Sequence, residues 1–299
     1  MRYSISDLEQ LSGVQTHTIR IWERRYHALS PSRTEGNTRF YDDNDLRRLL
    51  NIVGLSQKGM KISQVCALSE TEIDALLHLE MEDTEAEEHH FEYYISQLLG
   101  YGLSYDGYHF DHLISKCIAE YGMVESYKSV IYPLLVRLGL MWRRDHICPA
   151  QEHFLSSIIR QKLFAAINNV PLTKDSGSAW LLFLPEDEDH DIGLLFANYL
   201  LRVAGQRVIY LGSKVPLSSL QDTMNDVDAT HLLTFMVRNR PLPAAEAYLK
   251  ELGTLYPHKM LLIAGNGKLL SGISLPPNME WLQSIHDFER TIKKGRNVN

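Results

Sequence analysis

The chain has 299 residues, 44% hydrophobic and 22% charged, an ordinary globular mixture with enough apolar residues for real cores. It contains no run of about 18 apolar residues, which excludes a membrane span, and its first residues lack the apolar core of a signal peptide. The net charge of −7 argues at first against a nucleic-acid partner.

The charge is distributed unevenly along the chain. Residues 1–65 hold ten Lys and Arg against seven Asp and Glu, whereas residues 80–92 hold seven acids and neither Lys nor Arg. A basic head on an acidic body is typical of a DNA-binding protein, although most charge runs are simply solvated faces.

The cysteines are Cys66, Cys117 and Cys148. Their number is odd and their spacing fits no metal site, so no disulfide framework is predicted. We expect reduced thiols in a cytoplasmic protein.

Short helical patterns fill residues 1–75, which we call the head. Ser6 can cap a helix that begins at Asp7, and Gly13 then breaks the chain. A second helical pattern runs over residues 14–22. Two short helices joined by a glycine-containing turn predict a helix-turn-helix.

A two-stranded wing is predicted after the second helix. Glu35-Gly36-Asn37 forms its hairpin turn, because Gly and Asn tolerate positive φ. Arg33 and Arg39 flank that turn.

The basic residues of the helix and the wing predict a DNA interface. Hydroxyl side chains at the start of a recognition helix can approach base edges, and arginine can bind guanine or phosphate. Wing side chains suit phosphates. The alternative is an amphipathic helix with solvated arginines. The predicted DNA-contacting residues are Thr16, His17, Thr18, Arg20, Arg24, Arg25, Tyr26, Arg33, Asn37, Arg39 and Tyr41.

The head resembles the MerR family in three segments: Tyr-Ser-Ile-Ser-Asp-Leu over residues 3–8, Thr-Ile-Arg-Ile-Trp-Glu-Arg-Arg-Tyr over 18–26, and Arg33-Thr34 with Asn-Thr-Arg-Phe-Tyr over 37–41. The resemblance covers about residues 1–70. It implies a winged head that binds a near-palindromic operator in double-stranded DNA as a dimer. The family's long dimerisation helix would fall in residues 75–95, where no strong heptad is visible.

Two further domains are predicted. Apolar spacing over residues 76–172 indicates a four-helix bundle. Residues 173–299 alternate apolar strand-like runs with helical patterns, which predicts a doubly wound parallel, Rossmann-like sheet. The chain is therefore expected to be a multidomain α and α/β protein. The predicted strands are 178–184, 207–211, 231–236 and 259–264, and the predicted helices between them are 193–204, 217–227 and 244–256.

A histidine lies in the loop after the first predicted strand, in Glu188-Asp189-His190-Asp191-Ile192-Gly193. A neighbouring carboxylate can hold one ring nitrogen while the other faces a ligand. Gly193 would let the next helix begin close to a large ligand. Taken alone, such an acidic loop is more often solvent-exposed capping.

A second constellation precedes it. Trp142 is followed, after nine residues, by Glu152 and His153, which could line one pocket. Taken alone, a core tryptophan and a surface pair would be the simpler interpretation.

Together the two constellations resemble the cobalamin-binding module of light-dependent MerR-type repressors of the CarH-like family. This second resemblance extends the match to about residues 1–290. It implies that His190 ligates cobalt from below, with Glu188 or Asp191 as its polar support. It implies an adenosylcobalamin cofactor and self-association as a homodimer or homotetramer. By it, the cofactor-binding residues are Trp142, Glu152, His153, Glu188, His190, Asp191, Gly193, Thr234, Gly265 and Gly267.

The sequence departs from that family at several positions. Thr234-Phe235-Met236 stands where Ser-x-Leu receives the nucleotide tail, and Ala264-Gly265-Asn266-Gly267 stands where a Gly-Gly pair is usual. A tail pocket of lower affinity is therefore expected. Arg143 follows Trp142, where the photoreceptors carry the histidine that captures cobalt after illumination, and His146 lies one turn away.

These features favour a non-enzymatic regulator, expected to repress, in which cobalamin controls assembly on the operator. The second hypothesis is a MerR-type regulator whose degenerate ligand module acts as a protein-interaction domain without cobalamin. A cobalamin-dependent enzyme is disfavoured, because the chain has a DNA-binding head and no catalytic partner domain.

Overall fold

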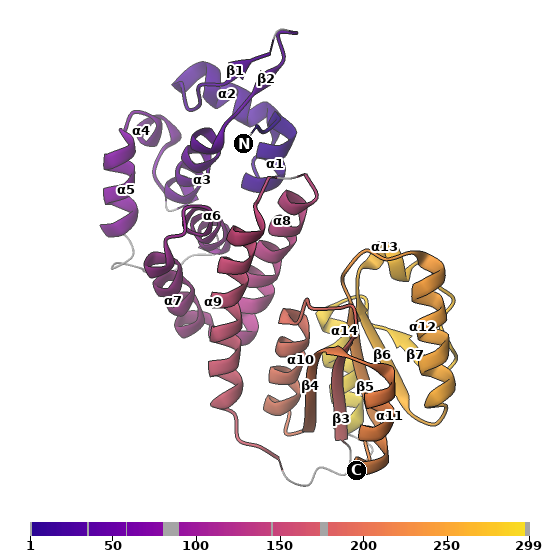
Figure 1. The fold of residues 1–299 in the computed structure, drawn as a ribbon. Coiled ribbons are helices and arrows are strands. Elements are labelled where there is room, and N and C mark those ends of the chain that lie inside the picture. The colour runs from indigo at the N-terminus through magenta and orange to yellow at the C-terminus, as the bar shows by residue number, and fades with distance from the viewer. Residues whose placement is uncertain are drawn as a thin grey trace. The chain divides into compact units, whose positions relative to one another are not determined.

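The chain forms two compact units, Met1–Ile158 and Ile159–Asn299, whose elements are labelled in Figure 1. The division into three domains stays a prediction. Residues 80–89, which include most of the acidic segment and the middle of the range expected for a dimerisation helix, lie outside the described residues. The computed structural model describes residues 2–34, 36–57, 59–79, 90–144, 146–173 and 179–296.

The predicted helix-turn-helix is confirmed, with one difference at its start. Ser4, not Ser6, caps the first helix, because its hydroxyl accepts from the backbone N–H of Asp7 and the Asp7 carboxylate accepts from the Ser4 N–H at 2.7 Å. Gly13 ends that helix in the left-handed region, at φ 75°. The elements of the head are α1 (Ile5–Ser12), α2 (Thr16–Tyr26), β1 (Ser32–Arg33), β2 (Arg39–Phe40), α3 (Asp43–Gln57), α4 (Ile62–Cys66) and α5 (Glu70–Leu79).

The wing is an antiparallel hairpin, as predicted. Arg33 lies opposite Arg39, and Asn37 in the turn has φ 63°. Tyr41 pairs with Tyr3 through two backbone hydrogen bonds of 2.8 and 2.9 Å. The wing is thereby attached to the segment that precedes α1.

The second helical region is the predicted bundle. Its helices pack closely at small residues: a Cβ atom on Gly102 of α6 would lie 2.1 Å from a methyl group of Leu155 on α9. Its elements are α6 (His90–Leu103), α7 (Gly107–Ser126), a π-helical turn η1 (Tyr127–Ile131), α8 (Tyr132–Trp142) and α9 (Pro149–Asn168).

Composition predicted free thiols and no membrane-spanning helix. Cys66, Cys117 and Cys148 are free, the first two of them buried. Among the described residues, no helix has the length and apolarity that crossing a membrane requires.

The second unit contains a five-stranded parallel sheet in the order β4-β3-β5-β6-β7. The first four strands confirm the four predicted from the sequence, whereas β7 and α14 were not predicted. The elements are β3 (Ala179–Pro185), α10 (Ile192–Val203), β4 (Arg207–Val215), α11 (Leu217–Asp226), β5 (His231–Met236), α12 (Leu242–Leu255), β6 (Met260–Gly265), α13 (Gly267–Leu270), β7 (Met279–Trp281) and α14 (Ile285–Arg296).

The two faces of the sheet are covered by different helices. Phe183 of β3 belongs to an apolar core that also contains Leu220 of α11 and Leu249 of α12. Side chains alternate along a strand, so Trp180 lies on the opposite face. There its ring meets Phe288 of α14 edge-on, with the ring centroids 5.9 Å apart.

The order of the strands positions the candidate ligand site. The strand after β3 in sequence, β4, lies on one side of β3, and the next strand, β5, lies on its other side. The order of the strands therefore switches direction at β3. In open α/β sheets, ligands bind at such a switch point, outside the carboxyl ends of the strands. The loop after β3, which carries His190, and the loop after β5 are therefore neighbours at this edge.

Gly265, at the end of β6, offers a test of this packing. Its φ is 126°, and a Cβ atom there would lie 2.2 Å from the carbonyl oxygen of Met236 on β5. We expect Gly265→Ala to lower the free energy of unfolding by about 2 kcal/mol, because it combines backbone strain with a clash. Denaturant unfolding measures the change, and an unchanged midpoint would contradict this account of Gly265.

Candidate nucleic-acid interface and cofactor site

Helix α2 presents most of the predicted DNA-contacting residues to solvent. Ile19 is fully buried and fixes the helix against the head, while Arg20, Arg24 and Arg25 are exposed. His17 is also exposed, and the other predicted residues of α2 (Thr16, Thr18 and Tyr26) are partly buried. This arrangement leaves a basic helix face accessible to a polyanion.

The wing arginines are exposed but already oriented by neighbours. Arg33 donates to the side-chain oxygen of Asn37 at 2.5 Å, within the hairpin. Arg39 donates to Glu23 of α2 at 3.0 Å. The wing and α2 are thus joined through Glu23, which is not among the predicted DNA contacts.

Tyr41 does not fit its predicted contact with phosphate. Its side chain is 0% exposed, and its hydroxyl donates to Glu23 at 2.9 Å. Burial and the neighbouring carboxylate raise the pKa of this hydroxyl. Tyr41 therefore supports the wing from inside the head.

The predicted upper-face residues lie at a helix end and a helix start. Trp142 is the last residue of α8 and is 48% exposed, which is unusual for so large an aromatic ring. Glu152 ends the first turn of α9 and His153 follows it, with the ring Nδ1 of His153 2.9 Å from a Glu152 carboxylate oxygen. An exposed aromatic side chain and an imidazole–carboxylate pair could cover a flat ligand.

The residues after Trp142 contact the head. Arg144 forms an ion pair with Asp7 of α1, and the ring of His146 lies 4.6 Å from the ring of Tyr3 at an angle of 56°. Arg143 is exposed. The nearest imidazole to Trp142 in the sequence is therefore already packed against another aromatic ring.

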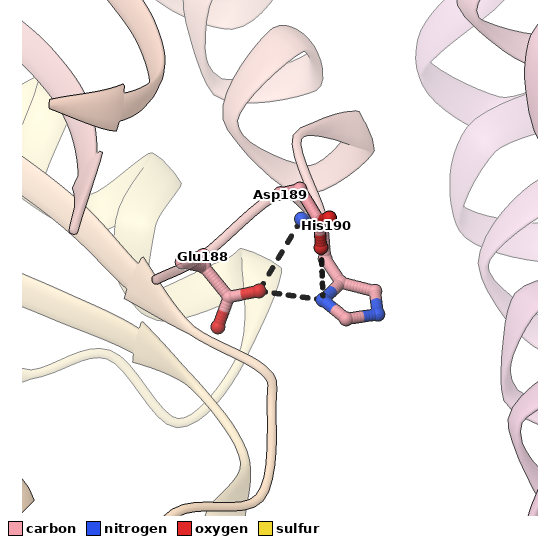
Figure 2. Close-up of side chains that lie close together, drawn as sticks. All are labelled: Glu188, Asp189 and His190. Atoms are coloured by element: carbon pink, nitrogen blue, oxygen red, sulfur yellow. Dashed lines mark hydrogen bonds and ion pairs between the residues drawn. The ribbon is translucent and has the colours of Figure 1, made fainter. Parts of the chain in front are cut away.

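His190 is held by a buried carboxylate. Its Nδ1 lies 2.5 Å from Oε1 of Glu188, and its side chain is 52% exposed, whereas Glu188 is 0% exposed. Figure 2 shows Glu188 and Asp189 both facing this nitrogen, with the other ring nitrogen directed away from them. The Nδ1 edge of the imidazole is thus held by carboxylates, and the Nε2 edge points away from them.

The Glu188 carboxylate is also fixed by the loop after β5. Its Oε2 accepts from the backbone N–H groups of Val237 and Arg238, both at 2.8 Å, and from the guanidinium of Arg240 at 3.1 Å. Burial alone would raise the pKa of Glu188, but hydrogen bonds from His190 and these N–H groups lower it to about 2. A charged Glu188 favours the tautomer with the proton on Nδ1, which puts the lone pair on Nε2, the nitrogen that ligates a metal in such a tautomer.

Glu188, Asp189 and His190 also lie close enough to be considered as a divalent-cation site. The donor chemistry argues against it. Nδ1 of His190 faces a carboxylate and needs its proton there, and both oxygens of Glu188 accept hydrogen bonds from nitrogen donors. Asp189 in turn lies 3.6 Å from Lys214. The cluster is better explained as an imidazole with its carboxylate support.

Asp191 does not support His190. Its carboxylate pairs with Arg160 at 2.6 Å, and the residue precedes α10. Of the two supports left open by the resemblance, Glu188 is the one that the structure places against the imidazole.

Thr234 and Gly193, both expected to contact the cofactor, lie toward opposite faces of the sheet. Thr234 is 2% exposed and pairs with Phe183, which places it on the face covered by α11 and α12. In the described part of the chain its hydroxyl has no hydrogen-bond partner. Gly193, on the opposite face, is contacted by Phe235: a Cβ atom there would lie 2.8 Å from the ring.

Of the two glycines at and after the end of β6, the fold itself requires Gly265 but not Gly267. Gly265 is required by the approach of Met236, and a Cβ atom on Gly267 would meet Trp281 at an ordinary distance of 3.8 Å. The residues around His190 thus fit a cobalt ligand, whereas Thr234 lies on the face of the sheet covered by α11 and α12, and the close contact at Gly265 is made by the fold itself.

The chain is similar to known regulators. Residues 3–71 match the family described as MerR HTH family regulatory protein, and residues 94–166 match the one described as B12 binding domain. The HTH-type transcriptional repressor CarH of Myxococcus xanthus is 31% identical over 221 residues, which cover 73% of each chain. CarA, an HTH-type transcriptional repressor of the same organism, is 28% identical over 245 residues, covering 80% of this chain and 78% of CarA.

A solved structure shares the fold of the larger part of the chain. The monomethylamine corrinoid protein of Methanosarcina barkeri superposes with a TM-score of 0.53 and 13% identity, over 68% of this chain and 97% of that one. The helical bundle followed by a Rossmann-like sheet is therefore a known arrangement. With the MerR head, the B12 binding domain and the identity to CarH, the chain belongs to the CarH-like family of MerR-type transcriptional regulators.

Proposed function

We propose that the protein is a transcriptional repressor whose affinity for operator DNA is controlled by cobalamin bound in its C-terminal half. One observation carries the proposal: the imidazole of His190 is fixed by a buried, charged Glu188 and presents its other nitrogen outward. This is the arrangement expected of a histidine that ligates a metal. The cofactor would supply the cobalt centre.

The head would bind double-stranded DNA through the exposed arginines of α2 and the wing. Cobalamin can control this binding only if it binds one assembly state more tightly than another. We propose that the favoured state is a homodimer or homotetramer, acting in the cytoplasm. Several heads on one operator gain effective concentration, so assembly strengthens binding without new base contacts.

A response to light is the second candidate function. It is favoured by the exposed ring of Trp142 and the Glu152–His153 pair, the residues that the CarH-like resemblance assigns to the upper face of the cofactor. Arg143 and the His146 ring packed on Tyr3 do not reproduce the cobalt-capturing histidine of the photoreceptors. If the protein responds to light, the final state would therefore not be one in which the residue after Trp142 ligates cobalt.

The test is to add adenosylcobalamin to the full chain in the dark and record the visible spectrum, the size of the assembly and operator binding. We expect a coloured complex that elutes with the protein, a larger assembly and tighter operator binding. A colourless protein with unchanged DNA affinity would instead support the protein-interaction alternative. Illumination of the complex then tests the second candidate, which an unchanged assembly would exclude.

A further inference from the structure

Phe235 packs against the start of the helix that follows His190. Its ring contacts Gly193 in the first turn of α10, at distances of 2.8 to 3.6 Å from an ideal Cβ position. Gly193 is three residues after His190, and Phe235 lies on β5, the neighbour of β3. The absence of a side chain at Gly193 is thus explained by Phe235, with no ligand needed.

The chemistry of the ligand shows why this position matters. In cobalamin the nucleotide tail hangs from the same face of the corrin ring that His190 would ligate. If His190 ligates cobalt, the base of the tail cannot do so, and the tail would need room beside the histidine. The natural place is the switch-point crevice between β3 and β5.

That crevice is filled on the face toward α10. Alternation along the strands places Trp180 and Leu182 of β3, and Leu233 and Phe235 of β5, on one face. The first three are at most 1% exposed, and the ring of Trp180 is covered by Phe288. Thr234, whose hydroxyl could have bonded to the tail, lies on the other face.

We propose that Phe235 closes this crevice to the nucleotide tail, so that the protein binds the corrin ring through His190 and leaves the tail outside. The ligand class is then corrinoids in general, including those without a lower nucleotide. This inference rests on the proposed function, since it assumes that His190 ligates cobalt.

The test compares two ligands that share the ring and the upper group. Adenosylcobinamide lacks the nucleotide tail that adenosylcobalamin carries, and both are titrated in the dark against the full chain. We expect adenosylcobinamide to bind at least as tightly, because it has no tail base to displace. Binding of adenosylcobalamin that is tighter by about tenfold or more would show that the tail is recognised and would overturn the proposal.

The two proposals fail in different ways. If neither ligand binds, the proposed function is wrong and the inference falls with it. If both bind and adenosylcobalamin is strongly preferred, only the inference is wrong.

Variants of Phe235 sharpen the test. Phe235→Ala removes the ring over Gly193, and we expect it to raise the affinity for adenosylcobalamin relative to adenosylcobinamide by about tenfold. Phe235→Leu keeps most of the volume and serves as the matched control, with an unchanged ratio. An unchanged ratio in a folded Phe235→Ala protein would contradict the role of the ring. If that variant does not fold, the comparison of the two ligands on the unaltered chain decides.

Discussion

Replacing His190 by alanine is expected to lower the affinity for adenosylcobalamin by about 100-fold or more, since changing even the supporting partner of a metal-bound histidine costs about 10- to 100-fold. The substitution removes the imidazole that Glu188 holds in place. The side chain is half-exposed, so its loss should leave the fold intact.

The visible spectrum of the bound cofactor distinguishes ligation of cobalt by His190 from binding without that ligand. With His190 present, the bound cofactor should show the spectrum of a histidine-ligated corrinoid. With alanine there, any residual binding should show the spectrum of the free cofactor. The matched control is His258→Ala, another exposed histidine of the same unit, for which we expect unchanged affinity and spectrum. If the His190→Ala protein binds adenosylcobalamin with unchanged affinity and an unchanged spectrum, His190 is excluded as the ligand.

Glu188→Gln tests the support separately. The amide can still occupy the site, but it has no charge to favour the proton on Nδ1 and would set its NH₂ group against one of the neighbouring nitrogen donors. We expect a loss smaller than that of His190→Ala, of about 10-fold. An affinity equal to that of the unaltered protein would show that the contact of 2.5 Å between Glu188 and His190 is not functional.

Local patterns were sufficient for most elements of the fold. The apolar run of β3 is buried along its whole length, so it stands out from its flanks without any knowledge of its neighbours. β7 has only three residues and is positioned by its pairing with β6. It has no apolar run that would have predicted it from the sequence. The prediction of the capping residue of α1 was wrong by two positions, because Ser4 and Ser6 each lie three residues before an acidic residue.

The site was predictable only where its partners are close in sequence. Glu188 lies two residues from His190, and a carboxylate at that distance was expected as its support. The N–H groups of Val237 and Arg238 lie about 50 residues further on, in a loop whose approach depends on the strand order. Thr234 was assigned to the tail because the resemblance places it at the serine of Ser-x-Leu, and the register of β5 shows that it lies on the face covered by α11 and α12.

Arg20→Ala is expected to lower operator affinity by about 10- to 100-fold, the cost of one specific arginine contact. Arg20 is exposed and lies beside Ile19, which is completely buried and sets the orientation of α2. Removing the guanidinium therefore takes away a contact to DNA without disturbing the packing of the head. Fluorescence anisotropy with operator DNA measures the loss, and thermal unfolding confirms that the head is intact.

The matched control for Arg20 is Arg290→Ala, which removes the same charge from an exposed position on α14. If net charge alone governed binding, the two variants would weaken it equally. The salt dependence then separates the two kinds of contact that Arg20 could make. Loss of a phosphate contact lowers the slope of log affinity against log salt by about 1 and weakens all sequences alike, whereas loss of a base contact relaxes specificity at one operator position. Because Arg20 follows the buried Ile19 directly and lies in the first half of α2, where recognition helices contact base edges, we expect the second result.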